Sequence, residues 1–274
     1  MAVLLSLAAA LAYGLSDFVG GIASRRTSAW PVAFVGTVAA LAGALVLALV
    51  TPGSPTSAHL WWGALAGVGS GAGGAFLYRG LAAGRMGVVA PISAVGAALL
   101  PVCVGVATGE RPALLVWLGI AAAVPGIWLV SREPGAGDLA AGILDGVLAG
   151  LGFGLLFAAM GQVPEAAGFA PLAVAQAVAV VGVAITATSL GGRWVPWHRS
   201  QAWGAVAGLL ATSAAAAFLL ATQTGLLTVA SVVTSLYPAV TIALAALVLR
   251  ERIHGPQGLG LLLCGVAVGL VAAG

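Results

Sequence analysis

Charged residues are scarce in this sequence, and lysine is absent. Only 6% of the 274 residues are charged, against roughly 25% in an average soluble protein, whereas 61% are hydrophobic and the mean hydropathy is +1.14. This composition predicts an integral membrane protein, with the lipid bilayer as its main partner. The ten basic residues are all arginines and give a net charge of only +3, so nucleic acid is excluded as a partner.

Cysteine, histidine and enzyme motifs are also sparse. The two cysteines, Cys103 and Cys264, lie inside apolar runs without metal-binding spacing, so we expect them to pack as small hydrophobic residues. The sequence contains no HExxH or GxSxG motif, and the phosphate-binding GxxxxGK[ST] motif needs the missing lysine. We therefore expect no enzymatic activity, no bound cofactor or metal, and no nucleotide hydrolysis by this chain.

Long apolar runs fill most of the chain. A membrane-spanning helix needs about 20 apolar residues, and short loops rich in Gly, Pro, Ser and Arg separate ten such runs. The first run lacks a basic leader and is echoed by the sixth, so it is predicted to stay in the mature protein. We expect an all-α integral membrane protein with spans at 2–23, 31–51, 60–82, 86–108, 113–131, 139–161, 170–190, 200–222, 225–249 and 256–273.

An internal repeat divides the chain into two halves. A shift of 141 residues aligns the sequence from Trp62 to Val130 without a gap, and it pairs Trp62 with Trp203, Glu110 with Glu251 and Arg111 with Arg252. We predict a duplicated unit, with five-helix repeats at 1–134 and 135–274. Because each half has an odd number of spans, the halves enter the membrane from opposite sides as inverted repeats. Such halves favour alternating access to a shared site, although duplication also serves simply to build a stable bundle.

Two aspartates lie inside predicted spans. Asp17 shares a helical face with Tyr13 and Ser16, and both Asp17 and Asp145 fall about 9 Å from the same, arginine-rich side of the membrane. An ionisable residue at this depth is normally paired and directed into the bundle; the alternative is a shallow carboxylate satisfied by a helix end or by water. The expected partners are Arg79 and Arg85.

Other polar residues complete a candidate solute path. The third span has glycines at spacings of three and four, which favour helix packing over cavity lining, and the same face carries Ser70 and ends in Tyr78. In the ninth span Pro238 removes a helix hydrogen bond, as Pro91 and Pro101 do in the fourth, and such breaks point to a substrate site or only kink the helix. The candidate path comprises Tyr13, Ser16, Asp17, Ser70, Tyr78, Arg79, Asp145, Gln176, Gln223, Tyr237 and Pro238.

The sequence resembles a known family in its last two spans. The segment SVVTSLYPAVTIALAALVLRERIHGPQGLGLLLCGVAVGLV is similar to the Leu-Tyr-Pro, Glu-Arg and Gly pattern of the EamA family of the drug/metabolite transporter superfamily, and LYRGLAAGRMGVVAPISA and GERP are similar to it in the first half. The segment YGLSDFVGGIASRR departs from the Trp-Gly that the family usually has there. Pro101 also lies nine residues before Glu110, against thirteen between Pro238 and Glu251.

The resemblance implies a secondary carrier in the cell membrane that exports an amino acid, metabolite or drug, with protons or a counter-transported solute as further partners. It implies no cofactor, and it leaves open a monomer or a homodimer. The alternative is a membrane-embedded structural or regulatory protein that keeps the fold without transport. A passive channel is disfavoured, because so apolar a chain does not supply a continuous polar pore.

The arginines predict an orientation. Nine lie at span ends on one side, and only Arg111 lies on the other. The positive-inside rule places the nine in the cytoplasm, so both termini are predicted outside, whereas the resemblance implies cytoplasmic termini. The nine are Arg25, Arg26, Arg79, Arg85, Arg132, Arg193, Arg199, Arg250 and Arg252.

Overall fold

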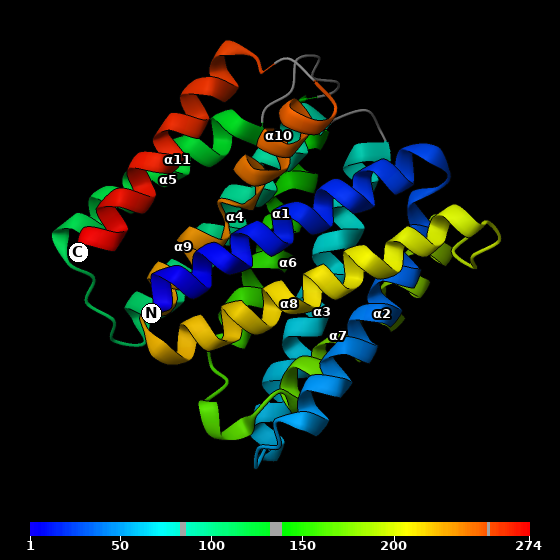
Figure 1. The fold of residues 1–274 in the computed structure, drawn as a ribbon, viewed down its shortest axis with the longest axis horizontal. Helices are drawn as coiled ribbons and strands as arrows, with labels where there is room; N and C mark the ends of the chain where they lie inside the picture. Colours follow the sequence, from blue (N-terminus) through cyan, green and yellow to red (C-terminus); the bar gives the residue numbers. More distant parts are fainter. Residues whose placement is uncertain (83–85, 132–138, 251–252) are drawn as a thin grey trace.

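The computed structural model describes residues 1–82, 86–131, 139–250 and 253–274, and all regular secondary structure in these ranges is helical. The chain runs through α1 (Ala2–Arg26), α2 (Ala29–Val50), α3 (Ser57–Ala82), α4 (Met86–Ala107), α5 (Leu114–Ser131), α6 (Leu139–Met160), η1 (Glu165–Ala167), α7 (Ala170–Ser189), η2 (Arg199–Ala202), α8 (Trp203–Thr224), α9 (Leu227–Thr234), α10 (Tyr237–Val248) and α11 (Gly255–Ala273) (Figure 1). Each apolar run of the sequence coincides with one helix, except the ninth.

The ninth run forms one candidate membrane span, Leu227–Val248, and its helix is interrupted at the level where Pro238 was expected to disturb the backbone. α9 ends at Thr234 and α10 restarts at Tyr237, with Pro238 at one of its first two positions. Proline has no N–H to continue the ladder and disfavours helical backbone in the residue before it, so it is best placed in the first turn of a new helix. Pro101, in contrast, leaves α4 continuous.

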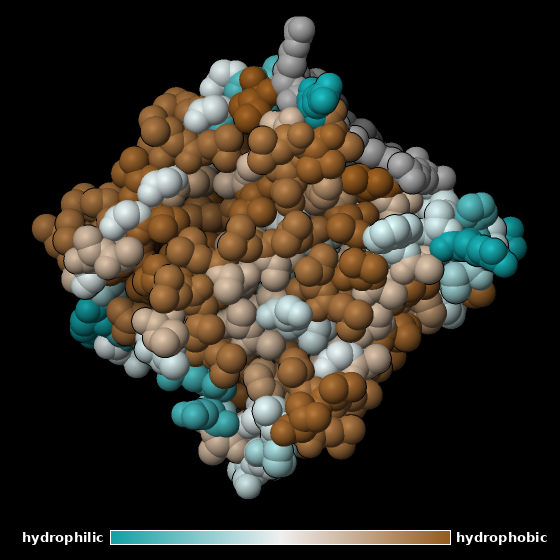
Figure 2. All heavy atoms as spheres, viewed as in Figure 1, coloured by the Kyte–Doolittle hydropathy of each residue, from teal (hydrophilic) through white to brown (hydrophobic). Residues whose placement is uncertain are grey.

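Several helices are suited to a bilayer. Among the described residues, seven helical segments are long and apolar enough to cross a membrane, and two shorter apolar helices span Ile92–Ala107 and Leu114–Val130. Hydrophobic side chains cover most of the face shown in Figure 2, and hydrophilic ones lie mainly at its margins. Exposed leucines such as Leu4, Leu49 and Leu262 are therefore lipid-facing.

The two halves of the chain pack in matching ways. α3 packs on α6 and α7, as α8 packs on α1 and α2; α4 packs on α6, as α9 and α10 pack on α1. Single contacts repeat with the 141-residue shift of the sequence. A Cβ on Gly119 would meet Val271 and the carbonyl of Ala267, and one on Gly260 would meet Val130 and the carbonyl of Gly126. These reciprocal contacts join α5 and α11 in antiparallel fashion.

Glycines allow the closest helix contacts. A Cβ on Gly208 would overlap the carbonyl oxygen of Gly36, and one on Gly63 would overlap the carbonyl of Pro171. Both positions therefore need glycine for α2 to meet α8 and for α3 to meet α7. Farther along α3, a Cβ on Gly74 would meet no atom within 4 Å. The glycine face of α3 is thus a packing surface at its start and borders open space near its end.

The two ends of the bundle differ in packing. Both termini lie at one end (Figure 1), which we call the terminal end. At this end Phe157, Met160, Phe218 and Leu219 are nearly inaccessible and belong to one large core cluster. All eight residues of α9 are buried, whereas none of the twelve residues of α10 is. We call the opposite end, where α10 finishes and most arginines lie, the arginine end, and α10 is the helix that is less buried there.

Candidate functional site

Helix α1 presents one face to lipid and the opposite face to the bundle. Leu4, Leu11 and Leu15 follow helical spacing and are 67%, 53% and 37% exposed, so they define the lipid face. At 100° per residue, Asp17 lies on nearly the opposite side of the helix. Its side chain is nevertheless exposed. A side chain that faces inward and is still accessible lines an opening inside the bundle.

The accessible part of this inner face begins at a definite level. Toward the N-terminus, Ala10 on the same face is only 3% exposed and Tyr13 is half-buried. Toward the C-terminus, Gly21 is exposed, and a Cβ on it would meet no atom within 4 Å. The opening therefore reaches from the arginine end down to about Tyr13, and Asp17 lies one helical turn above its floor.

Four aromatic rings form that floor. The ring centroid of Tyr13 lies 6.1 Å from Phe157 on α6 and 6.1 Å from Tyr237 on α10. Phe157 lies 4.7 Å from Phe218 on α8. The two phenylalanines are 4% and 1% exposed, whereas the two tyrosines are half-buried. The phenylalanines therefore close the terminal end, and the tyrosines are the part of the floor that a solute can reach.

Close contact between α1 and α10 positions the second tyrosine. A Cβ on Gly14 would meet Val240 and the carbonyl oxygen of Tyr237 at 2.9 Å or less. The hydroxyl of Thr241 donates to the carbonyl of Gly14 at 3.3 Å or of Tyr237 at 3.2 Å. Because α9 stops before Tyr237, α10 starts beside α1 at this level. The carboxylate of Asp17 consequently lies within electrostatic range of both tyrosine phenols.

Ser16 does not face this opening. It is 9% exposed, and its hydroxyl donates to the carbonyl of Ala207 on α8 at 2.8 Å. Thr212 makes a similar bond from α8 to the carbonyl of Ala40 on α2, also at 2.8 Å. Both hydroxyls join packed helices, so the structure separates Ser16 from Tyr13 and Asp17.

Asp145 lies in a different environment. It is 1% exposed, and its Oδ1 accepts a hydrogen bond from Nε of Arg79 at 2.7 Å, which joins α6 to α3. The Arg79 guanidinium also lies 4.8 Å from the ring centroid of Phe76, and its side chain is 45% exposed. Pairing with Arg79 was expected of either aspartate. No hydrogen bond or ion pair links Asp17 to any side chain that the structure describes.

The remaining sequence candidates are spread over the bundle. Ser70 and Gln176 are half-buried on α3 and α7. Gln223 donates from Nε2 to the carbonyl of Val163 at 3.3 Å, which ties the end of α8 to the loop after α6. Pro238 begins α10 beside Tyr237. The side chains of Tyr78, Arg25 and Arg26, and residues Arg85, Glu251 and Arg252, lie outside what the structure describes.

Three important residues were missed as sequence candidates for this region. Phe157 and Phe218 look like ordinary core residues in an apolar sequence, and no pattern marked them. Glu110 was noticed only as part of the repeated Glu-Arg pair. Its carboxylate accepts hydrogen bonds from the backbone N–H of Leu227 and, at 3.0 Å, of Thr228. A carboxylate at a helix start satisfies free N–H groups and the helix dipole, so Glu110 caps α9.

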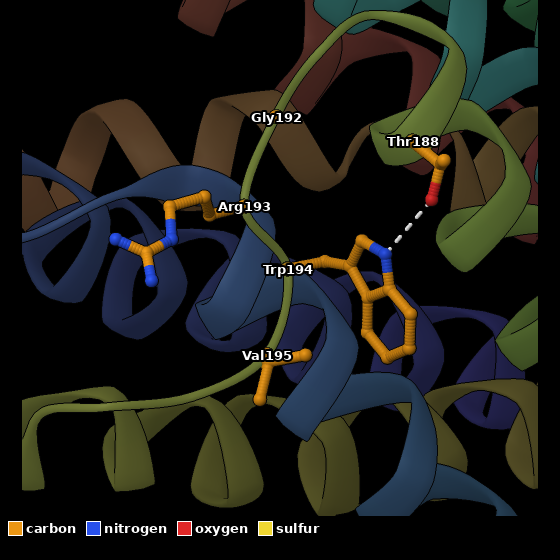
Figure 3. A pocket seen from close by; sticks show the side chains of 5 residues that line it. All are labelled: Thr188, Gly192, Arg193, Trp194 and Val195. Atoms are coloured by element: carbon orange, nitrogen blue, oxygen red, sulfur yellow. Dashed lines mark hydrogen bonds between the residues drawn. The ribbon is translucent and has the colours of Figure 1, made fainter.

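A separate surface pocket lies in the loop before η2 at the arginine end. Thr188, Gly192, Arg193, Trp194 and Val195 line it (Figure 3), and Nε1 of Trp194 donates to the hydroxyl of Thr188 at 2.9 Å. Trp194 also packs on Phe34 of α2 at 4.6 Å. The pocket contains no residue of the predicted path, and its lining serves to fasten the loop to α7 and α2.

The comparisons with known proteins agree with this architecture. No curated protein matches the sequence. One chain in a solved crystal structure superposes with a TM-score of 0.71 at 17% identity, covering 99% of this chain and 96% of that chain, which shows a shared fold. The sequence matches the EamA-like transporter family over residues 1–132 and again over 140–273. Because these two matches cover nearly the whole chain, the resemblance is confirmed, and the protein belongs to the EamA-like transporter family.

Proposed function

We propose that this protein, a membrane transporter of the drug/metabolite transporter superfamily, exports a small organic solute from the cell by alternating access. In this proposal the chain crosses the cell membrane ten times, as inverted repeats at 1–134 and 135–274. The boundary between them falls outside the described residues. The solute binds at the opening lined by Asp17, Tyr13 and Tyr237.

The contacts between the halves support the inverted arrangement. Glu110 follows α4 in the first half and caps the start of α9 in the second. The 141-residue shift relates Leu227 to Met86, the first residue of α4, so the end of one helix meets the start of its counterpart. Such antiparallel contacts between equivalent elements are expected of halves related by a two-fold axis perpendicular to the helices, which for membrane-spanning helices lies in the membrane plane.

The observation that carries the proposal is the difference between the two ends of the bundle. Buried α9 and the pair Phe157 and Phe218 close the terminal end, while α10 has no buried residue and Asp17 is accessible from the arginine end. A site closed on one side and open on the other is one of the two states that alternating access requires. In a duplicated fold, the second state arises when the halves exchange conformations.

Thiol labelling tests whether the site opens to one side. In a background with Cys103 and Cys264 replaced by serine, Gly21→Cys should react with a membrane-impermeant maleimide added from the side where Arg193→Cys reacts. Ala10→Cys, on the same face of α1 but below the floor, should be protected in the absence of solute. Equal labelling of Gly21→Cys and Ala10→Cys would contradict the closed terminal end.

Solute flux tests transport itself. Ligands are first found by screening metabolites and drugs for those that raise the melting temperature of the purified protein, because a ligand that binds the folded state stabilises it. Flux of such a ligand into sealed vesicles containing the pure protein should saturate with concentration. A stabilising ligand that never crosses the membrane would favour a regulatory or structural role.

The arginine count assigns the arginine end to the cytoplasm in this proposal, which places both termini outside. The described opening then faces the cytoplasm, as export requires for solute loading. A reporter fused after Gly274 that is active only in the cytoplasm tests this orientation. An active reporter would show that the C-terminus is cytoplasmic, and the proposed orientation and the inferred direction of transport would then both be reversed. The proposed fold would be unaffected.

A further inference from the structure

We infer that Asp17, Tyr13 and Tyr237 form a binding site for an organic cation with a substituted ammonium group. This inference rests on the proposed function, because it assigns a solute class to the opening described there. It depends on three observations: one accessible carboxylate without an ion-pair partner among the described residues, two reachable aromatic rings beside it, and a packed floor below them.

The carboxylate supplies a single negative charge inside the bundle. Asp17 faces away from the lipid stripe of α1, is accessible, and has no hydrogen bond or ion pair with a described side chain. An ionisable side chain within a membrane protein is normally paired or faces a water-filled cavity. Asp145 shows the paired case, since it accepts from Arg79. Asp17 instead faces the opening, so a positively charged solute can serve as its partner.

The rings select the kind of cation. The centroids of Tyr13 and Tyr237 are 6.1 Å apart, so a cation at this level lies within the roughly 6 Å over which an aromatic face attracts it. No hydrogen bond links either phenol to a described residue, and both side chains are half-buried. Aromatic faces bind substituted ammonium groups well because such groups are weakly hydrated. A small inorganic cation such as Ca²⁺ would instead need about six to eight oxygen ligands, more than one carboxylate and two phenols supply.

The floor sets the depth of the site. Phe157 packs on Tyr13 from below and is 4% exposed, and Phe218 packs behind it at 1%. A solute entering from the arginine end therefore stops at the two tyrosines, one turn past Asp17. A zwitterionic amino acid also needs a cation for its carboxylate, and Arg79, the described arginine of the predicted path, is already paired with Asp145.

Equilibrium binding tests the inference without relying on transport. The purified wild-type protein in detergent is titrated by calorimetry with phenyltrimethylammonium and with its neutral isostere, tert-butylbenzene. We expect saturable binding of the cation and at least about tenfold weaker binding of the isostere, since roughly 1.4 kcal/mol of charge interaction corresponds to tenfold in affinity. Equal binding of the two compounds would overturn the inference, and this comparison requires no variant.

Variants then assign the interaction to residues. Asp17→Asn should weaken cation binding at least about tenfold, a size expected for loss of a charge-assisted contact. Tyr13→Phe should keep the affinity and Tyr13→Leu should lower it, because the ring and not the hydroxyl attracts the cation. Glu165→Gln removes one carboxylate charge at an exposed site of the terminal end and should leave binding unchanged. Undiminished binding by Asp17→Asn would overturn the assignment.

The outcomes separate this inference from the proposed function. If phenyltrimethylammonium and tetramethylammonium both fail to bind while another solute shows saturable flux into vesicles, the solute class is wrong and the transporter stands. If the cation binds through Asp17 but no solute crosses the membrane, the site stands and the proposed transport fails.

Discussion

Asp17 and Asp145, the carboxylates of α1 and α6, occupy opposite kinds of environment. Asp145 is 1% exposed and accepts a hydrogen bond from Arg79, so its charge is paired inside the protein and joins α3 to α6. Asp17 is accessible and has no such partner among the described side chains. A buried charge must be paired within the fold, whereas a charge at a cavity wall can pair with water or with a bound solute. The contrast separates a structural ion pair from a site for solute.

The same contrast distinguishes the features that the two halves share from those that occur in only one half. If the 141-residue shift found for Trp62–Val130 is extended to the first and sixth helices, it relates Asp17 to Ala158, which is 5% exposed, and Asp145 to Leu4, which is 67% exposed. Neither aspartate therefore has a charged counterpart in the other half. The glycine contacts of α5 and α11, in contrast, repeat residue for residue. The repeat has kept the backbone packing that both halves need, while the side chains facing the opening have diverged.

Neutralising Asp17 should give the largest effect on function. In Asp17→Asn, flux of the solute found by screening should fall about 10- to 100-fold, as expected from losing a charged hydrogen-bonding contact of about 1.5–3 kcal/mol. The melting temperature should stay close to that of the wild type, because the carboxylate supports no described contact. Flux is measured in vesicles with equal amounts of folded protein. Full flux would show that Asp17 is only a hydrated helix residue, and the comparison with Asp145 would then lose its functional meaning.

Removing Asp145 should instead lower stability. Asp145→Ala leaves the Arg79 guanidinium without its carboxylate, and we expect the free energy of unfolding to fall by about 1–3 kcal/mol. The loss is no larger because Arg79 is 45% exposed, so water can replace part of the interaction. Asp145→Asn should cost less, because an amide oxygen still accepts from Nε. Thermal unfolding in detergent measures both variants, and replacing Arg79 as well should show coupling between the two sites. Additive effects would mean that the ion pair contributes nothing to the fold.

The sequence predicted most of the fold but only part of the site. Hydrophobic run length gave the helix bounds to within about three residues, because each span must match the bilayer. It also indicated Arg79 as an aspartate partner, since few cations lie at that depth. Which helix each side of α1 faces depends on tertiary packing, so the sequence grouped Ser16 with Asp17 although Ser16 bonds to α8. The floor formed by Phe157 and Phe218 left no signal in a chain rich in apolar residues.

Glu110 provides a third carboxylate, which binds backbone instead of a side chain or solute. In Glu110→Gln the amide accepts more weakly from the N–H groups of Leu227 and Thr228 and no longer complements the helix dipole, so we expect a loss of about 1 kcal/mol. Hydrogen exchange of these two amides should become faster. Arg111→Gln, at the neighbouring exposed position, is the matched control. Unchanged exchange in Glu110→Gln would show that α9 does not depend on this cap.

Ser16→Ala should have the smallest effect and gives the sharpest test of the Asp17 assignment. Ser16 is adjacent to Asp17 in sequence, yet its hydroxyl donates to the carbonyl of Ala207, away from the opening. Losing one hydrogen bond between membrane helices costs about 0.6 kcal/mol on average, because the freed carbonyl still accepts from its own helix. We therefore expect a small fall in melting temperature and wild-type flux. If Ser16→Ala reduced flux as strongly as Asp17→Asn, transport would depend on how closely α1 packs against α8, and not on the charge that Asp17 presents to the solute.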